Sequence, residues 1–122
     1  MPKISKALLA AQNSLELSRS LRDYDLIGNC LNKIATVHYY QGEYFDALFY
    51  FDESISAYKQ AGNIKGMASA TNNKGAIYYY LGNLLKALEH YKGALMLSET
   101  LADKENSVAS IRNNMAGIYV KL

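Results

Sequence analysis

Apolar residues recur along this chain at spacings of three and four, the spacing that gives a helix one buried face. The clearest case is the segment 44–61, in which one stripe contains Ala47, Leu48, Phe51, Ser54, Ile55 and Tyr58. Polar and turn-forming residues separate such segments at regular intervals. The pattern predicts six helices, over residues 4–21, 24–41, 44–61, 64–81, 84–101 and 104–121. The chain is therefore expected to be all-α.

The same pattern returns with a fixed period. Ala7, Ala47 and Ala87 begin three matching stretches that lie 40 residues apart. A second set lies out of phase with the first: segment 32–42 matches 72–82, and a third copy starts at Asn113 with a shift of 41. Self-similarity at a period of about 20–50 residues is typical of a repeat array. Each unit here is expected to contain a helix A, a turn, a helix B and a second turn.

The residues between the helices repeat as well. Asp23, Asn63 and Asp103 share one phase, each just before a predicted helix. An Asp or Asn side chain at this place can accept from the free N–H groups of the helix start. Gly42 and Gly82 follow the two A helices that are rich in aromatic residues. Glycine ends a helix there at least cost, because it adopts the left-handed conformation without strain.

Six positions of each unit keep their character: a small residue, an aromatic three positions on, then Gly, Ala, a second aromatic and a second small residue. In the first complete unit they are Ala35, His38, Gly42, Ala47, Phe51 and Ser54. In the second they are Gly75, Tyr78, Gly82, Ala87, Tyr91 and Ala94, and a last half-unit supplies Ala116 and Tyr119. This order resembles the tetratricopeptide repeat over nearly the whole chain. The Asn-Asn pair and the long period are similar to repeats of kinesin light chains and bacterial signalling proteins.

The resemblance implies a fold: a right-handed superhelical array of antiparallel helix pairs, or α-solenoid, with about six helices. It divides one domain, 1–122, into helix B of a partial repeat (4–21), repeat 1 (24–61), repeat 2 (64–101) and helix A of a partial repeat (104–121). The period of 40–41 residues exceeds the usual 34 or so, so each helix is longer. Lys74 stands where the family has leucine, and Gly75, inside a helix, predicts a close helix crossing.

A helices line the concave side of such arrays, and the resemblance places a partner-binding groove there. Its positions are Asn29, Asn32, Lys33, Thr36, Tyr40, Ser69, Asn72, Asn73, Ala76, Tyr80, Ser110, Asn113, Asn114 and Gly117. Asn has both donors and acceptors, so a row of Asn can bond the backbone of an extended peptide. The same row could instead bond between neighbouring A helices and determine how the repeats stack. Lys33, Lys121 and Arg112 would favour an acidic ligand or a C-terminal carboxylate.

Other residue types that often carry chemistry have structural interpretations here. In the runs 39–40 and 78–80, consecutive Tyr side chains point in different directions on a helix. One Tyr of each run is therefore expected to pack in the core, while the next lines the groove or the contact between helix A and helix B. His38 occupies the position of Tyr78 and is expected to pack. His90 has no second ligand one turn away, and Cys30 has no His in sequence to act as its base. No enzyme, metal site or cofactor is therefore expected.

Composition narrows the partner classes. The net charge of +2 is too small to indicate nucleic-acid binding, which usually needs a strongly basic face. No apolar run approaches the roughly 20 residues that span a membrane. The single cysteine excludes an intrachain disulfide, and a cytoplasmic location is expected. A protein or peptide remains as the expected partner.

The two ends lack the partner helix that each internal helix has. Ile111, Met115 and Ile118 lie on an A helix with no B helix after it, so they are expected to be bare and to promote self-association. Two explanations compete: the chain is a piece of a larger signalling protein, or its ends pair with another copy to form a homo-oligomer. The leading function is a protein-interaction scaffold. The alternative is a self-association module with no separate ligand.

Overall fold

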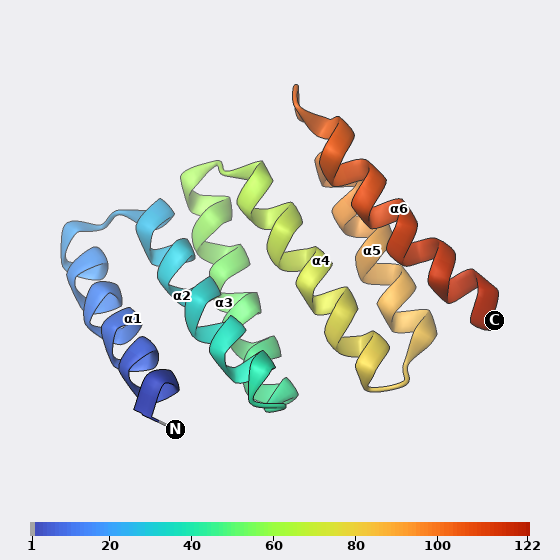
Figure 1. Cartoon of the computed structure of the whole chain (residues 1–122). Coiled ribbons are helices and arrows are strands. Elements are labelled where there is room, and N and C mark those ends of the chain that lie inside the picture. Colours follow the sequence, from blue (N-terminus) through green and yellow to red (C-terminus); the bar gives the residue numbers. More distant parts are fainter. Residues whose placement is uncertain (1) are drawn as a thin grey trace.

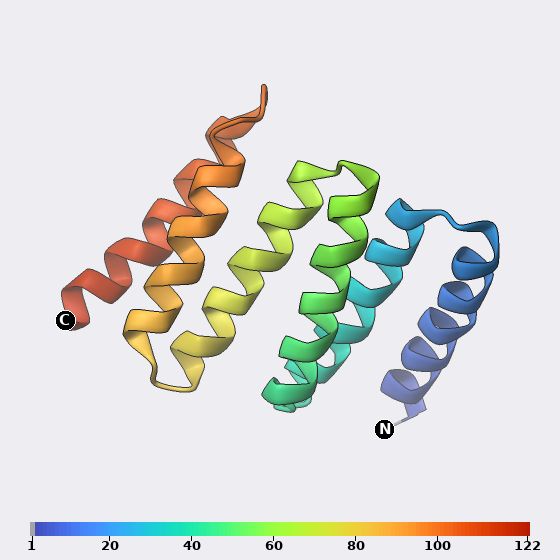
Figure 2. The same cartoon turned by 180° about the vertical axis from the view of Figure 1, so that it is seen from behind.

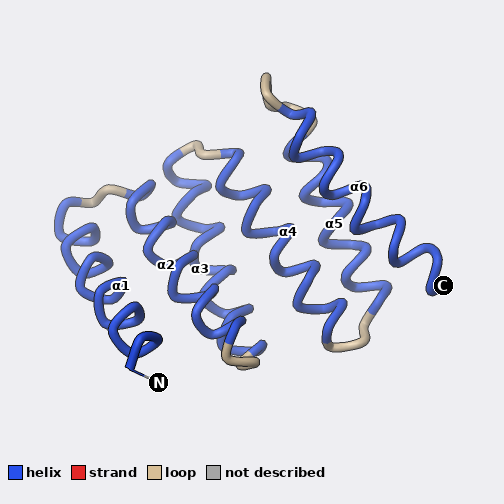
Figure 3. Tube along the Cα trace, viewed as in Figure 1, coloured by secondary structure: helices blue, strands red, loops and turns tan. Residues whose placement is uncertain are grey.

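The computed structural model describes residues 2–122, with side chains from residue 6 onward. Within that range the chain forms helices joined by turns and contains no strand (Figure 3). The helices are α1 (Pro2–Leu21), α2 (Tyr24–Tyr40), α3 (Tyr44–Ala61), α4 (Ile64–Tyr80), α5 (Leu84–Ser98) and α6 (Lys104–Lys121). None of these six is both long and apolar enough to cross a lipid bilayer. The all-α prediction is confirmed.

The helices stack side by side in chain order as an α-solenoid (Figure 1). Helix α2 packs most extensively against α3, and α4 against α5, so each pair forms an antiparallel hairpin. Helices α2 and α6 lie in front of α3 and α5 in Figure 1, and behind them in Figure 2. Helix α2 also contacts α4 directly. The division into two full repeats and two half-repeats stays a prediction.

Left-handed residues follow α1 to α4: a glycine in three cases, and Arg22, with φ of 53°, after α1. Gly42 and Gly82 have φ of 78° and 82°, as predicted, and Gly62 after α3 has φ of 71°. The residue equivalent to Gly62 in the next unit is Ala102. Helix α5 ends at Ser98 rather than at the predicted residue 101, and 99–103 form turns.

The helix starts follow the predicted capping in two of three cases. Asp23 Oδ1 and Asn63 Oδ1 accept from the backbone N–H three residues on, at 3.1 and 2.8 Å. The prediction for Asp103 is wrong: its side chain does not cap α6 and instead accepts from Lys65 Nζ at 3.3 Å. Asn83, which the sequence did not single out, caps α5 through the Lys86 N–H at 3.1 Å.

Replacing Asn83 by alanine is expected to lower the free energy of unfolding by about 1 kcal/mol, because the capping bond to α5 is lost. The matched control is Asn83→Ser, which keeps a side-chain oxygen able to cap the helix. That control should change stability by less than about 0.5 kcal/mol. Urea unfolding of both variants measures the difference, and equal losses would contradict the capping role.

The core is a row of apolar clusters between neighbouring helices rather than one central core. Residues of α2, α3 and α4 form the middle cluster, with Phe51 1% exposed and Ile77 fully buried. At Gly75 a Cβ atom would lie 2.8 Å from the ring of Tyr91, which confirms the predicted close crossing. Lys74 does not pack as a leucine would: its ammonium bonds the carboxylate of Asp52 on α3.

The apolar residues of α6 are covered by α5. Ile118 is fully buried, Ile111 is 3% exposed and Met115 packs against the same cluster. The prediction that these three residues form a bare face is therefore wrong, because the side of α6 that carries them turns toward its preceding B helix. The large apolar side chains that are exposed here are Tyr119 and Val120 of α6 and Leu122, which follows the helix.

Candidate functional site

The predicted groove residues all lie on α2, α4 and α6, and none of them is buried. The exposed ones are Asn29, Lys33, Tyr40, Ser69, Tyr80, Ser110, Asn113 and Gly117. The half-buried ones are Asn32, Thr36, Asn72, Asn73, Ala76 and Asn114. One side of the array thus presents amides, hydroxyls and tyrosine rings to solvent.

Two neighbouring cavities open between these helices. The first has a volume of about 280 Å³ and is lined by Thr36, Tyr39, Tyr40, Phe51, Asn73 and Ala76. The second has about 320 Å³ and is lined by Tyr39, Ala76, Tyr79, Tyr80, Tyr91, Asn113, Asn114 and Gly117. Because they share Tyr39 and Ala76, we treat them as one surface, the tyrosine groove. Tyr39, Phe51, Tyr79 and Tyr91 line it although the sequence did not assign them to it.

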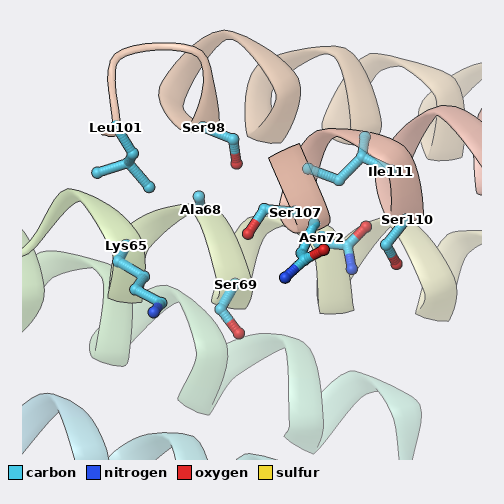
Figure 4. Close-up of a pocket in the computed structure, with 10 residues that line it drawn as sticks. Lys65, Ala68, Ser69, Asn72, Ser98, Leu101, Ser107, Ser110 and Ile111 are labelled. Carbon is cyan, nitrogen blue, oxygen red and sulfur yellow. The ribbon is translucent and has the colours of Figure 1, made fainter. Parts of the chain in front are cut away.

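A third cavity, of about 320 Å³, lies between α4, the end of α5 and α6 (Figure 4). It is lined by Lys65, Ala68, Ser69, Asn72, Ser98, Leu101, Asn106, Ser107, Ser110 and Ile111. We name it the Ser98 cavity. It contains Ser69, Asn72 and Ser110 of the predicted groove, whereas Asn29, Asn32 and Lys33 line none of the three cavities.

The row of asparagines is partly used inside the protein. Asn29 Oδ1 accepts from the Tyr58 hydroxyl at 2.5 Å. Asn114 Nδ2 donates to Asn72 Oδ1 at 3.5 Å, a long bond between neighbouring A helices. Asn32 Oδ1 is buried and bonds to none of the described residues. The row therefore contributes to stacking at some positions, while Asn73 and Asn113 line the tyrosine groove.

Tyrosine rings from α2, α3 and α4 meet at one end of the groove. The Tyr39 ring centroid lies 5.8 Å from that of Tyr44 and 6.0 Å from that of Tyr80, while Tyr44 and Tyr80 are parallel at 6.3 Å. Burial, assisted by Tyr80, raises the pKa of Tyr39 above its usual range. Burial likewise raises the pKa of Tyr91 to about 12. The two hydroxyls therefore stay protonated near neutral pH and can donate as well as accept.

The α2–α3 hairpin and the α4–α5 hairpin each contain one stacked His–Tyr pair, with the residue types exchanged. His38 of α2 stacks on Tyr50 of α3 at 5.3 Å, and Tyr78 of α4 stacks on His90 of α5 at 5.0 Å. The interplanar angles are 2° and 4°. These contacts confirm that His38 has a packing role, and they assign the same role to His90.

Stability is expected to fall in mild acid because of His90. Burial, with Lys74 nearby, lowers its pKa below the ordinary value of 6.5. The unfolded chain then binds more protons just below pH 6.5, so this contribution is complete above that pH and decreases as the pH falls. We expect a lower urea midpoint at about pH 5 than at about pH 7.5. His90→Tyr, which copies Tyr50, should reduce the difference, and an unchanged difference would contradict this assignment.

Among the described residues, His38, Glu43 and Asp46 bring possible metal-ligand atoms within 4.8 Å of one another. The two carboxylates are exposed, and Glu43 Oε1 accepts from His38 Nδ1 at 3.2 Å. An exposed His–Glu hydrogen bond of this kind at a turn does not require a bound metal ion. The cluster is also confined to the α2–α3 hairpin, since the residues 40 positions later are Tyr78, Asn83 and Lys86.

Comparison with known proteins gives one family and two informative structures. Residues 28–61 match the family model described as tetratricopeptide repeat. The crystal structure of BtubC (BKLC) from P. vanneervenii is similar with a TM-score of 0.84 and 22% identity, covering 98% of this chain and 49% of that one. The TPR2AB domain of yeast Sti1, solved as a complex with pHSP90, has a TM-score of 0.58 and 17% identity, covering 96% and 50%.

No curated protein matches the chain in sequence. The chain spans about half the length of the two solved structures, and at these identities they show a shared fold. The matched segment 28–61 runs from within α2 to the end of α3 and includes the turn at Gly42. Residues 28–61 therefore match one tetratricopeptide repeat, and the chain as a whole shares the α-solenoid fold of the two solved structures.

Proposed function

We propose that the tyrosine groove binds an extended segment of another protein. The observation that favours this function is the pair of neighbouring cavities, about 280 and 320 Å³, that runs between successive A helices. Peptide backbone groups need donors and acceptors, which Asn73, Asn113 and Asn114 supply. Exposed tyrosines add large contact area at small entropic cost; Tyr40 and Tyr80 are 78% and 61% exposed.

The comparisons support a scaffold that binds proteins. The yeast Sti1 domain, which shares the fold, was solved with a bound partner. In a longer protein, the present array would then act as a sensory or scaffolding segment of a signalling protein. Protein–protein binding of this kind requires no cofactor.

Charge beside the groove favours a partner segment that carries a carboxylate. The Lys121 ammonium lies 4.5 Å from the centroid of the Tyr79 ring, which lines the groove. Lys33 is exposed on α2. Arg112, by contrast, pairs with Glu99 at 3.5 Å and is already partly neutralised. The preference for acidic segments would therefore depend on the two lysines more than on Arg112.

The groove is tested with peptides selected from a random display library on the immobilised 122-residue chain. We expect Asn73→Ala combined with Asn113→Ala to weaken the selected peptides about 30-fold, because about 1 kcal/mol is lost at each amide. Lys92→Ala, on the exposed surface of α5, is the control and should leave affinity unchanged. Fluorescence anisotropy measures both, and unchanged affinity in the double variant would exclude this groove.

Self-association is a second candidate function, supported by apolar side chains at the two ends. Leu17 and Leu21 of α1 are 61% and 63% exposed, and Val120 of α6 is 86% exposed. Leu17 of α1 is equivalent to Ala57 of α3, and Ala57 packs toward the preceding helix α2. The exposed face of α1 that carries Leu17 is therefore the face on which a preceding helix would pack. Light scattering should show an oligomer that Leu17→Lys with Leu21→Lys converts to a monomer. A monomer before the substitutions would exclude this function.

A further inference from the structure

The Ser98 cavity contains a buried polar group that the protein itself does not satisfy. Ser98 is fully buried at the end of α5, and its Oγ bonds to none of the described residues. Its oxygen points into the space above Ala68 and Ser69 (Figure 4). A buried hydroxyl without a partner costs about 1–3 kcal/mol.

The equivalent place in repeat 1 is filled by a tyrosine. Tyr58, 40 residues before Ser98, is 4% exposed and inserts its ring between α2 and α4. A Cβ atom on Gly28 or Gly66 would lie 2.6 or 2.7 Å from that ring, so both positions must be glycine for the ring to fit. The Tyr58 hydroxyl donates to Asn29 Oδ1 at 2.5 Å.

The second hairpin has no tyrosine at this position, but a polar side chain stands at the place of Asn29. Ser98 stands for Tyr58, and Ser69 stands for Asn29. Ala68 and Asn106 stand for the two glycines, yet a cavity of about 320 Å³ remains. An apolar cavity of about 150 Å³ is enough to hold benzene. The space therefore suffices for an aromatic ring.

The cavity also adjoins the tyrosine groove. Asn72 lines the cavity and Asn114 lines the groove, and these two side chains are joined by the 3.5 Å hydrogen bond. A segment that lies along the groove and passes α6 would bring its side chains to the mouth of the cavity. The occupant can thus come from the same partner that the groove binds.

We propose that the Ser98 cavity takes a tyrosine side chain of the bound partner segment, a proposal that rests on the proposed groove for the source of that side chain. The ring occupies the open part of the cavity, next to the place equivalent to that of Tyr58, because Ala68 and Asn106 carry the Cβ atoms that Gly28 and Gly66 lack. The phenol hydroxyl bonds Ser69, as Tyr58 bonds Asn29. The repeat thus exchanges an internal tyrosine for one supplied by a ligand.

The cavity is tested without any partner by titrating p-cresol, the side chain of tyrosine, into the 15N-labelled chain. We expect saturable NMR shifts at Ser69, Ser98 and Asn106, and at least tenfold weaker binding of toluene, which lacks the hydroxyl. The triple variant A68G/S98Y/N106G copies repeat 1 and should abolish p-cresol binding. Ser98→Met fills the same space by another side chain and should do so too. Absence of saturable shifts, or equal binding by Ser98→Met, overturns the proposal.

The source of the tyrosine is tested by peptide selection on the chain and on the blocked variants. Peptides selected on the unmodified chain should be enriched in tyrosine at one position and bind Ser98→Met at least tenfold more weakly. Selected peptides without tyrosine enrichment overturn the proposal while leaving the groove intact. If no peptide is selected at all, the proposed function fails instead, and the p-cresol titration still decides whether the cavity accepts a phenol.

Discussion

Phe51→Ala is expected to lower the free energy of unfolding by about 3–5 kcal/mol, the range for truncating a buried aromatic ring. Phe51 is 1% exposed and packs in the cluster that joins α2, α3 and α4. Its removal leaves a void between two repeats, and the surrounding helices can close only part of it. Urea unfolding followed by circular dichroism measures the loss.

Phe49→Ala provides the control on the same helix. Phe49 is 57% exposed, so its truncation should change stability by no more than about 0.5 kcal/mol. The residue type is identical and the positions differ by two, which leaves burial as the main difference. Comparable losses in the two variants would contradict the assignment of the middle cluster as the core.

Gly75→Ala is expected to destabilise the chain although alanine is the better helix former. The new Cβ would lie 2.8 Å from the ring of Tyr91, which is 4% exposed and has little room to move. Overpacking of this kind costs about 1–3 kcal/mol, against a gain of about 0.5–1 kcal/mol from helix propensity. The overpacking is the larger effect, so the thermal and urea midpoints should fall.

Gly117→Ala should have the opposite sign. No atom outside its own helix lies within 4 Å of the position that a Cβ would take. The substitution should therefore raise the free energy of unfolding by about 0.5–1 kcal/mol. A stabilised Gly75→Ala variant would show that α4 and α5 do not approach as closely as the structure indicates.

Local rules predicted most of the fold. The period of apolar residues gave all six helices, and Gly42 and Gly82 gave the turns between A and B helices. The end of α5 was missed: the helix ends at Ser98, three residues before the predicted end. The role of Asp103 was missed because its side chain bonds Lys65, 38 residues away, and a pattern of local spacings does not contain such a pairing.

The accessible face could be predicted from the sequence, but the use of individual side chains could not. All groove positions are accessible, since helix periodicity and the repeat phase determine which side each residue takes. Asn29 bonds Tyr58 across 29 positions of sequence, so its amide is engaged inside the protein. Ile111 and Ile118 were expected to be bare because the terminal A helix lacks a following partner. The preceding helix α5 covers them instead.

The central claim is that the side formed by α2, α4 and α6 binds a protein segment. It is tested most directly by mapping a library-selected peptide onto the 15N-labelled chain by NMR. The account predicts shifts concentrated at Thr36, Asn73, Tyr80 and Asn113, with the exposed residues Phe49 and Met96 of the B helices unaffected. Shifts confined to α3 and α5 would contradict it.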